Sequence, residues 1–301
     1  MKIVVLGSKG QLGCCLSDQF IKTTFEVVYL SRDDFDIGDL ASLDKNISLL
    51  KPSIVINASA YTAVDKAEND FHQANLVNHL AVAKLADICL HLNACLIHIS
   101  TDYVFDGNAI LPYVEDSQTN PQGVYGMSKL KGELSIKASG CRFFIIRTSW
   151  VFSEYGNNFL KTMLKLGTKH KELSIIHDQV GCPTYAQDIA KAIILMLPYI
   201  RNNKHTSEIF HYCGIQSCSW YEFAAFIFMK AEAKGHKVPS LLKQIASDEF
   251  KSIAARPAYS VLDCSRIQEE FDINPSNWMN GVISSIEKID SNAILNKIST
   301  I

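Results

Sequence analysis

The sequence predicts an α/β fold, with helices on both faces of a parallel sheet and a smaller C-terminal lobe. Short apolar runs rich in β-branched residues alternate with helical patterns through the first half of the chain, which is typical of strands joined by helical crossovers. A glycine-rich segment follows the first apolar run directly. The chain has 301 residues, of which 48% are hydrophobic, enough for one large domain with a smaller lobe.

The first strand is predicted at residues 3–6, and it passes into Gly7, Gly10 and Gly13 and a helical pattern over residues 11–21. In this order the glycines permit a tight turn and close backbone approach, and the free N–H groups of the helix face a pyrophosphate. The spacing is Gly-x-x-Gly-x-x-Gly, and a plain strand-to-helix turn is the alternative. The context favours a Rossmann-type dinucleotide site.

The second strand, residues 27–30, ends at Ser31 and Arg32, with Asp33 and Asp34 next. An acidic residue here holds the ribose diol of NAD, whereas a basic one accommodates the additional phosphate of NADP. Because Ser31 and Arg32 come first, we expect NADPH, with NADH as a possible substitute. A solvated loop is the alternative.

The third strand, residues 53–57, is followed by small residues that let the backbone lie against a cofactor. A long helix is predicted over roughly residues 70–92. It leads to the fourth strand, an apolar run from residue 95 to Ile99 that ends in Ser100 and Thr101. A buried parallel strand delivers such hydroxyl groups to the carboxyl edge of its sheet, where a ligand is expected.

Tyr125 comes directly before a predicted helix over residues 126–138 that carries Lys129, four residues on, so the two side chains share one face. A free tyrosine has a pKa near ~10, and a neighbouring ammonium lowers it by stabilising the phenolate, which makes the phenol a usable acid at neutral pH. Taken alone, such a pair is far more typical of a solvated helix with an incidental Tyr and Lys. The hydroxyl groups of the preceding strand favour a catalytic interpretation.

The strict alternation ends after a fifth strand at residues 143–147. Later elements are a helix over residues 185–197, a strand over 209–214, and a helix over 221–233 that Ser219 and Glu222 begin as a capping box. We therefore expect residues 1–148 to form an NADP(H)-binding Rossmann domain to which about 184–215 returns, about 149–183 and 216–290 to form a substrate-binding lobe, and 291–301 to form a frayed tail.

Charge and composition exclude several classes of partner. The formal net charge is −2, and Lys and Arg are scattered, so nucleic acid is not an expected partner. The nine cysteines show no Cys-x-x-Cys spacing, which indicates reduced thiols and a cytoplasmic location. No apolar run approaches the roughly 20 residues that cross a bilayer, and no signal peptide is expected.

Several segments carry a resemblance to a known family: 7–13, Ser-Thr-Asp-Tyr-Val-Phe at 100–105, and Tyr125-Gly126-x-x-Lys129. Together they resemble the extended short-chain dehydrogenase/reductases. Further segments narrow the resemblance to the dTDP-4-dehydrorhamnose reductases, in matching order from residue 1 to about 278: 57–68, Arg-Thr-Ser-Trp-Val-Phe at 147–152, and Gly-Cys-Pro-Thr at 181–184.

The resemblance implies NADPH-dependent reduction of the C4 ketone of dTDP-4-dehydro-6-deoxy-L-mannose to dTDP-L-rhamnose, by a monomer or homodimer. It implies the catalytic residues Thr101, Tyr125 and Lys129, with Asn78 supporting the backbone beside them or lying on the surface. The implied cofactor residues are Gly7, Gly10, Gln11, Leu12, Gly13, Ser31, Arg32, Asp36, Ile37, Ala58, Ala60, Tyr61, Thr62, Ile99, Tyr125 and Lys129. The implied substrate residues are Thr101, Asp102, Tyr103, Phe105, Trp150, Asn158 and Arg256, with Val104 beside Phe105 in the wall of the sugar pocket.

Some members of the family bridge two subunits with Mg²⁺ through acidic side chains. Cys15 and Gln187 occupy those places here and are poor ligands for a hard cation, so no metal is expected.

Two alternatives stay open at this point. One is a reductase of another nucleotide deoxyhexulose or, less readily, a sugar-nucleotide epimerase, since all share the glycine turn and the Tyr-Lys pair. The other is a non-catalytic NADP-binding regulatory subunit like that of methionine adenosyltransferase, which resembles the same reductases.

Overall fold

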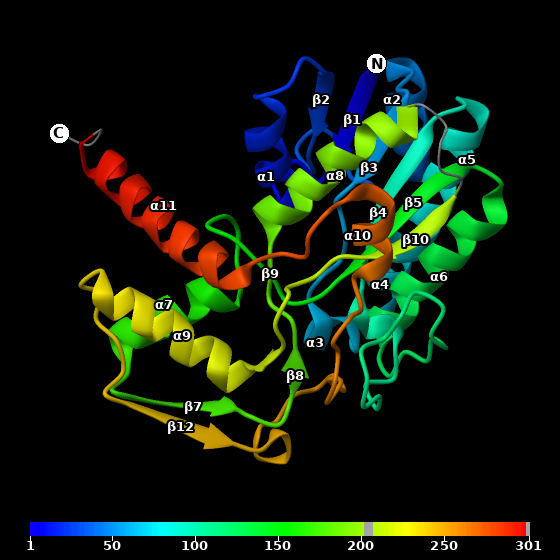
Figure 1. Ribbon diagram of the computed structural model, residues 1–301. Coiled ribbons are helices and arrows are strands. Elements are labelled where there is room, and N and C mark those ends of the chain that lie inside the picture. Colours follow the sequence, from blue (N-terminus) through cyan, green and yellow to red (C-terminus); the bar gives the residue numbers. More distant parts are fainter. Residues whose placement is uncertain (202–206, 299–301) are drawn as a thin grey trace.

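The computed structural model describes residues 1–201 and 207–298, and it is built around a parallel sheet of six strands (Figure 1). The strand order is β10-β5-β4-β3-β1-β2, and every neighbouring pair is parallel. Chain order reverses between β1 and β3, which is where α/β sheets bind ligands. The strands are β1 (Lys2–Leu6), β2 (Glu26–Leu30), β3 (Ile54–Asn57), β4 (Cys95–Thr101), β5 (Arg142–Thr148) and β10 (Glu208–His211).

Helices cover both faces of this sheet, as the sequence predicts. In β1, Ile3 and Val5 belong to one buried cluster with the helices α1 and α8, while Val4 and Leu6 belong to a second cluster with α2 and α5. Successive side chains of a strand point to opposite faces, so a fully apolar strand requires a helix layer on each side. These helices are α1 (Gln11–Phe20), α2 (Leu40–Leu50), α5 (Ala81–His91), α6 (Val124–Ser139) and α8 (Ala186–Arg201).

The crossover between β3 and β4 was predicted as one helix. It is a short helix α3 (Val64–Ala67), then α4 (Phe71–Asn75), a π-helical turn η1 (Leu76–Leu80) and α5. The junction residues between α4, η1 and α5 keep right-handed helical angles, so these three form one rod with a π-turn. Such turns are frequent at functional sites.

A second body packs beside the sheet and has its own hydrophobic core, to which Phe152, Phe223 and Trp278 contribute (Figure 1). Its longer helices and strands are α7 (Phe159–Lys169), α9 (Trp220–Ala233), α11 (Trp278–Ile298), β7 (Glu172–Ile176) and β12 (Leu241–Ile245). The remaining short elements are η2 (Asp102–Val104), β6 (Val151–Phe152), β8 (Val180–Gly181), β9 (Thr184–Tyr185), β11 (Cys218–Ser219), η3 (Ser247–Glu249) and α10 (Ser265–Phe271).

Two predictions for the C-terminal part of the chain, a capping box and a frayed tail, have different outcomes. The capping box is confirmed, because the Glu222 N–H donates to Ser219 Oγ at 3.2 Å and the Ser219 N–H donates to Glu222 Oε2 at 2.7 Å. The frayed tail expected from residue 291 is wrong for its first part, since α11 continues to Ile298. The Ser291 hydroxyl donates to the Glu287 carbonyl one turn back, at 2.9 Å. The last three residues of that expectation lie outside the described residues.

Over the described ranges, none of the helices has the length and apolar character that a membrane span requires. All nine cysteines are free of disulfides.

Candidate active site

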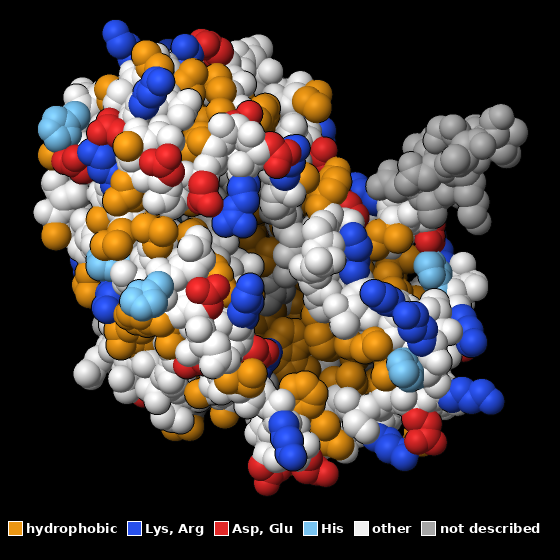
Figure 2. All heavy atoms as spheres, turned by 180° about the vertical axis from the view of Figure 1, so that it is seen from behind, with side chains coloured by type: hydrophobic (Ala, Val, Ile, Leu, Met, Phe, Trp, Pro, Cys, Tyr) orange, Lys and Arg blue, Asp and Glu red, His pale blue; other side chains and the backbone are white. Residues whose placement is uncertain are grey.

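A deep cleft of about 870 Å³ runs along the carboxyl ends of the parallel strands. Figure 2 shows it from behind as a hollow between the two bodies, with hydrophobic side chains inside. Its walls come from the turns after β1 to β4, the start of α6 and the segment after β5. The predicted site residues on its lining are Gly7, Gly10, Gln11, Leu12, Ser31, Arg32, Ile37, Ala58, Ala60, Tyr61, Thr62, Ile99, Thr101, Asp102, Tyr103, Tyr125, Lys129, Trp150, Asn158 and Arg256.

Two glycines of the turn after β1, Gly7 and Gly13, have no room for a side chain. A Cβ on Gly7, whose φ is +77°, would lie 2.8 Å from the Ser59 backbone nitrogen, and one on Gly13 would lie 2.2 Å from the Gly7 carbonyl oxygen. Gly13 is outside the cleft lining, so its part is to pack α1 against the turn. Gly10 caps α1 without a side-chain hydrogen bond, which leaves the first N–H groups of the helix able to bind an anion. This cradle fits a dinucleotide pyrophosphate.

The end of β2 presents a hydroxyl and a guanidinium to the cleft, and its carboxylates are engaged elsewhere. Asp34 Oδ2 accepts hydrogen bonds from the Ser31 N–H at 2.7 Å and the Ser31 hydroxyl at 2.9 Å, and Asp33 forms an ion pair with Lys9. Ser31 and Arg32 line the cleft, whereas neither carboxylate does. The Arg32 side chain is 73% exposed. This arrangement fits a phosphate better than a ribose diol.

Asp36 does not lie where the resemblance implies. Its Oδ1 accepts from the Gly38 N–H at 2.9 Å, its Oδ2 lies 3.9 Å from Arg32 Nε, and the residue is outside the cleft lining. The neighbouring Ile37 does line the cleft. A short Asp side chain readily bonds the backbone two residues on, which here takes the carboxylate away from the cleft.

Asn78, in the π-turn η1, is buried and holds the loop after β3. Its Oδ1 accepts from the Tyr61 N–H at 2.8 Å, and its Nδ2 donates to the Tyr61 carbonyl and to Ser128 Oγ, both at 3.0 Å. The surface alternative for Asn78 is therefore wrong. The side chain ties the cleft-lining loop to α6.

Tyr125 and Thr101 come together at the cleft from two different elements. Thr101 ends β4, and its hydroxyl donates to Asp102 Oδ1 at 2.9 Å and accepts from the Tyr103 N–H at 3.2 Å. Tyr125 lies in the first turn of α6, with its ring edge-on to that of Tyr103 at 5.5 Å between centroids.

Lys129 follows one turn after Tyr125 and is only 1% exposed. Its side-chain nitrogen lies 2.6 Å from the Ile99 carbonyl oxygen and 3.1 Å from Nε2 of His98. Both are atoms of β4, so the side chain of Lys129 anchors α6 to the end of that strand.

Burial is the main cause of the pKa shifts of Tyr125 and Lys129. It raises the pKa of Tyr125 to about 12, with the Thr101 hydroxyl lowering it and the Asp102 charge raising it. Burial lowers the pKa of Lys129 to about 8, against the opposing charge of Glu133. The expectation that Lys129 depresses the pKa of Tyr125 is wrong for this structure. Tyr125 keeps its proton at neutral pH and is a donor.

A buried ion pair lies behind these groups. Arg147 of β5 donates to both carboxylate oxygens of Glu133 of α6, with Nη2 to Oε2 at 2.7 Å and Nε to Oε1 at 3.0 Å. The two side chains are 3% and 1% exposed. The Ser100 hydroxyl also donates to Glu133 Oε1. The pair thus joins β4, β5 and α6 beneath the cleft.

Two tryptophans line the wall of the cleft that the second body provides. Trp150, at a positive φ of 48°, stacks on Trp220 with ring centroids 3.4 Å apart and planes 4° apart. The ring of Trp150 also lies against Gly181, where a Cβ would be 2.5 Å from Cε2. Trp220 was not predicted as a site residue. Its only sequence signal was its place within the capping box, directly after Ser219.

Arg256 and Asn158 reach the cleft with part of their polar groups already bonded. Arg256 Nη2 donates to Asp65 at 2.7 Å, while its buried Nε has no hydrogen-bond partner in the described part of the chain. Asn158 caps α7 and donates to Gln11 Oε1 at 2.8 Å, which joins the second body to the glycine-turn helix.

Phe105 and Val104 do not wall the cleft. Phe105 is buried in the sheet core, where it stacks on Tyr113 at 4.3 Å, and the Arg147 guanidinium lies 5.1 Å from its ring centroid. Val104 is fully buried in the same cluster. The 3-10 turn η2 breaks the alternation of β4, and both side chains pass into the core instead of the pocket.

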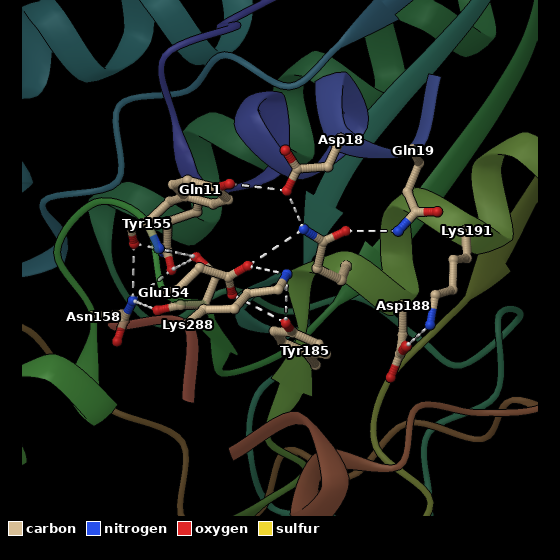
Figure 3. A network of polar contacts seen from close by, with 12 residues as sticks. Gln11, Asp18, Gln19, Glu154, Tyr155, Asn158, Tyr185, Asp188, Lys191 and Lys288 are labelled. Atoms are coloured by element: carbon tan, nitrogen blue, oxygen red, sulfur yellow. Dashed lines mark hydrogen bonds and ion pairs between the residues drawn. The ribbon is translucent and has the colours of Figure 1, made fainter. Parts of the chain in front are cut away.

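A polar network that begins at Gln11 and Asn158 on the cleft lining connects the second body to α1 and α8 (Figure 3). Glu154 pairs with the Lys288 ammonium and accepts from the Tyr185 hydroxyl at 3.0 Å. Gln187, at one of the positions where the resemblance implies an acidic ligand, donates to Asp18 and to Glu154. Within residues 1–201 and 207–298, no group of three or more His, Cys, Asp or Glu side chains is arranged to hold a metal ion.

The fold and site are those of a short-chain dehydrogenase/reductase. They combine a parallel sheet, a glycine turn, a threonine at the end of a strand, and a Tyr-Lys pair on the next helix. The chain belongs to the family described as the RmlD substrate binding domain, whose model matches residues 1–291.

Individual relatives agree with this assignment. The chain is 39% identical over 281 residues to a dTDP-4-dehydrorhamnose reductase of Aggregatibacter actinomycetemcomitans, covering 92% of this chain and 95% of the relative. It superposes on a dTDP-4-dehydrorhamnose reductase of Clostridium acetobutylicum with a TM-score of 0.89 at 36% identity, covering 96% and 100% of the two chains. The enzyme of the same name from Bacillus anthracis, solved in complex with NADP, gives 0.86 at 32% identity, covering 95% and 99%.

Proposed function

We propose that the chain catalyses NADPH-dependent reduction of the C4 ketone of dTDP-4-dehydro-6-deoxy-L-mannose to dTDP-L-rhamnose. One observation carries the proposal: Thr101, Tyr125 and Lys129 lie together on the lining of a cleft that begins at the glycine turn. The names of the relatives, and the NADP bound to one of them, support the substrate and the cofactor.

The residues around the glycine turn would hold NADPH, which supplies the hydride. The N–H groups of α1 would bind the pyrophosphate, and Ser31 and Arg32 the ribose phosphate. The backbone of Ala58 to Thr62 would lie against the rest of the cofactor, with Ile37 and Ile99 as apolar walls. Lys129 would bind the hydroxyls of the second ribose.

Tyr125 would donate the proton to the ketone oxygen as negative charge develops there. Its raised pKa keeps the phenol protonated. Thr101 would donate a second hydrogen bond to the same oxygen once its single hydroxyl hydrogen turns from Asp102 Oδ1 to the ketone.

The second body would bind the nucleotide sugar. Arg256 has an unpartnered buried Nε that suits a diphosphate, and Trp150, Tyr103, Asp102 and Asn158 line the sugar side. We propose the domain division given by the sequence: 1–148 with about 184–215 for the cofactor, and about 149–183 and 216–290 for the substrate. Return of β10 to the sheet supports this. We also propose a cytoplasmic enzyme, monomeric or homodimeric.

The test is oxidation of NADPH, followed at the nicotinamide absorbance, with dTDP-4-dehydro-6-deoxy-L-mannose made by the upstream enzymes. We expect turnover and formation of dTDP-L-rhamnose. Cofactor binding without turnover would contradict the proposal and favour another deoxyhexulose or a regulatory role.

Arg32→Ala should weaken binding of NADPH by roughly tenfold or more and leave NADH almost unchanged, because an exposed guanidinium on a phosphate contributes on the order of 1–2 kcal/mol. Dissociation constants for both cofactors, from fluorescence titration, check this. Arg201→Ala, an exposed Arg at the end of α8, is the control. Equal losses for the two cofactors would show that Arg32 does not bind the phosphate.

A further inference from the structure

Behind Lys129 lies a row of hydrogen-bonded polar groups, and the contact at its far end determines which atoms along the row carry hydrogens. It begins at Asn57, the last residue of β3. The Asn57 Oδ1 accepts from the Ser59 N–H at 3.1 Å and from the Ser59 hydroxyl at 2.6 Å. A backbone N–H can only donate, so the atom facing it must be the oxygen of the amide. The Asn57 NH₂ group therefore faces the other way, toward β4.

That NH₂ group lies 3.1 Å from Nδ1 of His98, the cross-strand neighbour of Asn57. Because an amide nitrogen only donates, Nδ1 must be the bare, accepting nitrogen of the imidazole. His98 is fully buried, and burial by itself holds its pKa well below its ordinary value, so the ring is neutral. A neutral ring with a bare Nδ1 carries its one proton on Nε2.

The Nε2–H of His98 points at the side-chain nitrogen of Lys129, 3.1 Å away. An ammonium has three donors and no lone pair, so it cannot accept this hydrogen. A neutral amine can accept it and still donate to the Ile99 carbonyl oxygen at 2.6 Å. The contacts are thus all satisfied only if Lys129 has lost its proton.

We propose that His98 is a positioning residue that stabilises the neutral amine form of Lys129 in the free protein, and that NADPH binding shifts Lys129 to the ammonium form with uptake of a proton from solvent. The second half rests on the proposed function, in which Lys129 binds the cofactor ribose. The new ribose hydroxyls draw the nitrogen away from His98, and there the ammonium has acceptors for its protons.

The charged groups around Lys129 act consistently with this. Burial favours the neutral amine, and Glu133, one turn further along α6, is the group that opposes it. Much of the charge of Glu133 is taken up by its bidentate pair with Arg147. From β4, the facing group is the neutral His98.

The first experiment needs no variant and no cofactor. In protein labelled with ¹⁵N-histidine, the nitrogen shifts of His98 should show a bare Nδ1 and a protonated Nε2, as the Asn57 contact requires. His98→Gln identifies the resonances. A protonated Nδ1, or a doubly protonated ring, would overturn the proposal whatever the enzyme does with a substrate.

The second experiment uses Asn57→Asp to reverse the direction of the hydrogen bonds that run from residue 57 through His98 to Lys129. A carboxylate still accepts from Ser59 but also accepts from His98 Nδ1–H, which leaves Nε2 bare and able to accept from an ammonium. We expect the pKa of Lys129, followed through its ¹³Cε resonance, to rise by about one unit, a tenfold change in proton affinity. Asn46→Asp in α2 is the matched control and should not move it. An unchanged pKa of Lys129 in a folded Asn57→Asp variant would contradict the role of His98.

Proton uptake on cofactor binding is the third readout. Calorimetry in buffers of different ionisation enthalpy, at about pH 9, should show uptake of a large fraction of one proton per NADPH bound. The affinity for NADPH should fall as the pH rises through the pKa of Lys129 in the free protein, since binding requires the protonated form. Binding of NADPH without proton uptake would refute the protonation of Lys129 on cofactor binding. Absence of NADPH binding would refute the proposed function instead.

Discussion

Tyr125→Phe is expected to reduce turnover by roughly 10²–10⁴-fold, the contribution of a positioned general acid. The change removes the hydroxyl and keeps the ring, whose edge-on contact with Tyr103 at 5.5 Å holds it in place. Burial raises the pKa of Tyr125 to about 12, so the protonated donor is the form present at neutral pH. Loss of the hydroxyl therefore removes the proton source itself. Steady-state and single-turnover rates with NADPH and the ketone measure the effect.

The controls separate catalysis from folding and binding. The dissociation constant for NADPH should change little in Tyr125→Phe, because the proposed contacts of the cofactor lie on the glycine turn, Arg32 and Lys129. Tyr221→Phe, a partly buried residue at the core of the second body, should keep normal turnover. Near-normal turnover of Tyr125→Phe would remove Tyr125 from the mechanism.

Local patterns in the sequence predicted the sheet and the elements around it. An apolar strand followed by glycines and a helix has few physical solutions, and Gly7 and Gly13 are confined to those places by backbone atoms less than 3 Å from where a Cβ would lie. The capping box at Ser219 is equally local, since its partner is three residues away. Signals of this kind depend on neighbours in the chain, so they are readable without the fold.

The errors arise where a side chain depends on distant residues. Phe105 follows a hydroxyl-bearing strand end, yet η2 sends it into the core against Tyr113. Trp220 meets Trp150 only because α9 packs beside the segment after β5. The pKa of Tyr125 was expected to fall beside Lys129, but burial, which no spacing reveals, raises it.

Breaking the buried pair of Glu133 and Arg147 on one side should strongly destabilise the sheet side of the cleft. Arg147→Met is expected to lower the free energy of unfolding by about 3–5 kcal/mol, because it leaves a carboxylate that is 1% exposed without its counter-charge. The exposed pair of Lys191 with Asp188 provides the contrast, and Lys191→Met should cost less than about 1 kcal/mol. Urea unfolding followed by circular dichroism measures both.

The double variant Glu133→Met, Arg147→Met identifies the cause of that loss. If the cost of Arg147→Met is an unpaired buried charge, removal of the carboxylate as well should restore much of the stability, although Ser100 then loses its acceptor. If the double variant is less stable than Arg147→Met, the loss comes from packing around the guanidinium, which also lies against Phe105. Restored stability with low turnover would separate the contribution of the pair to stability from its contribution to the site. Glu133 accepts a hydrogen bond from Ser100, at the end of the strand that carries Thr101, and lies one turn from Lys129.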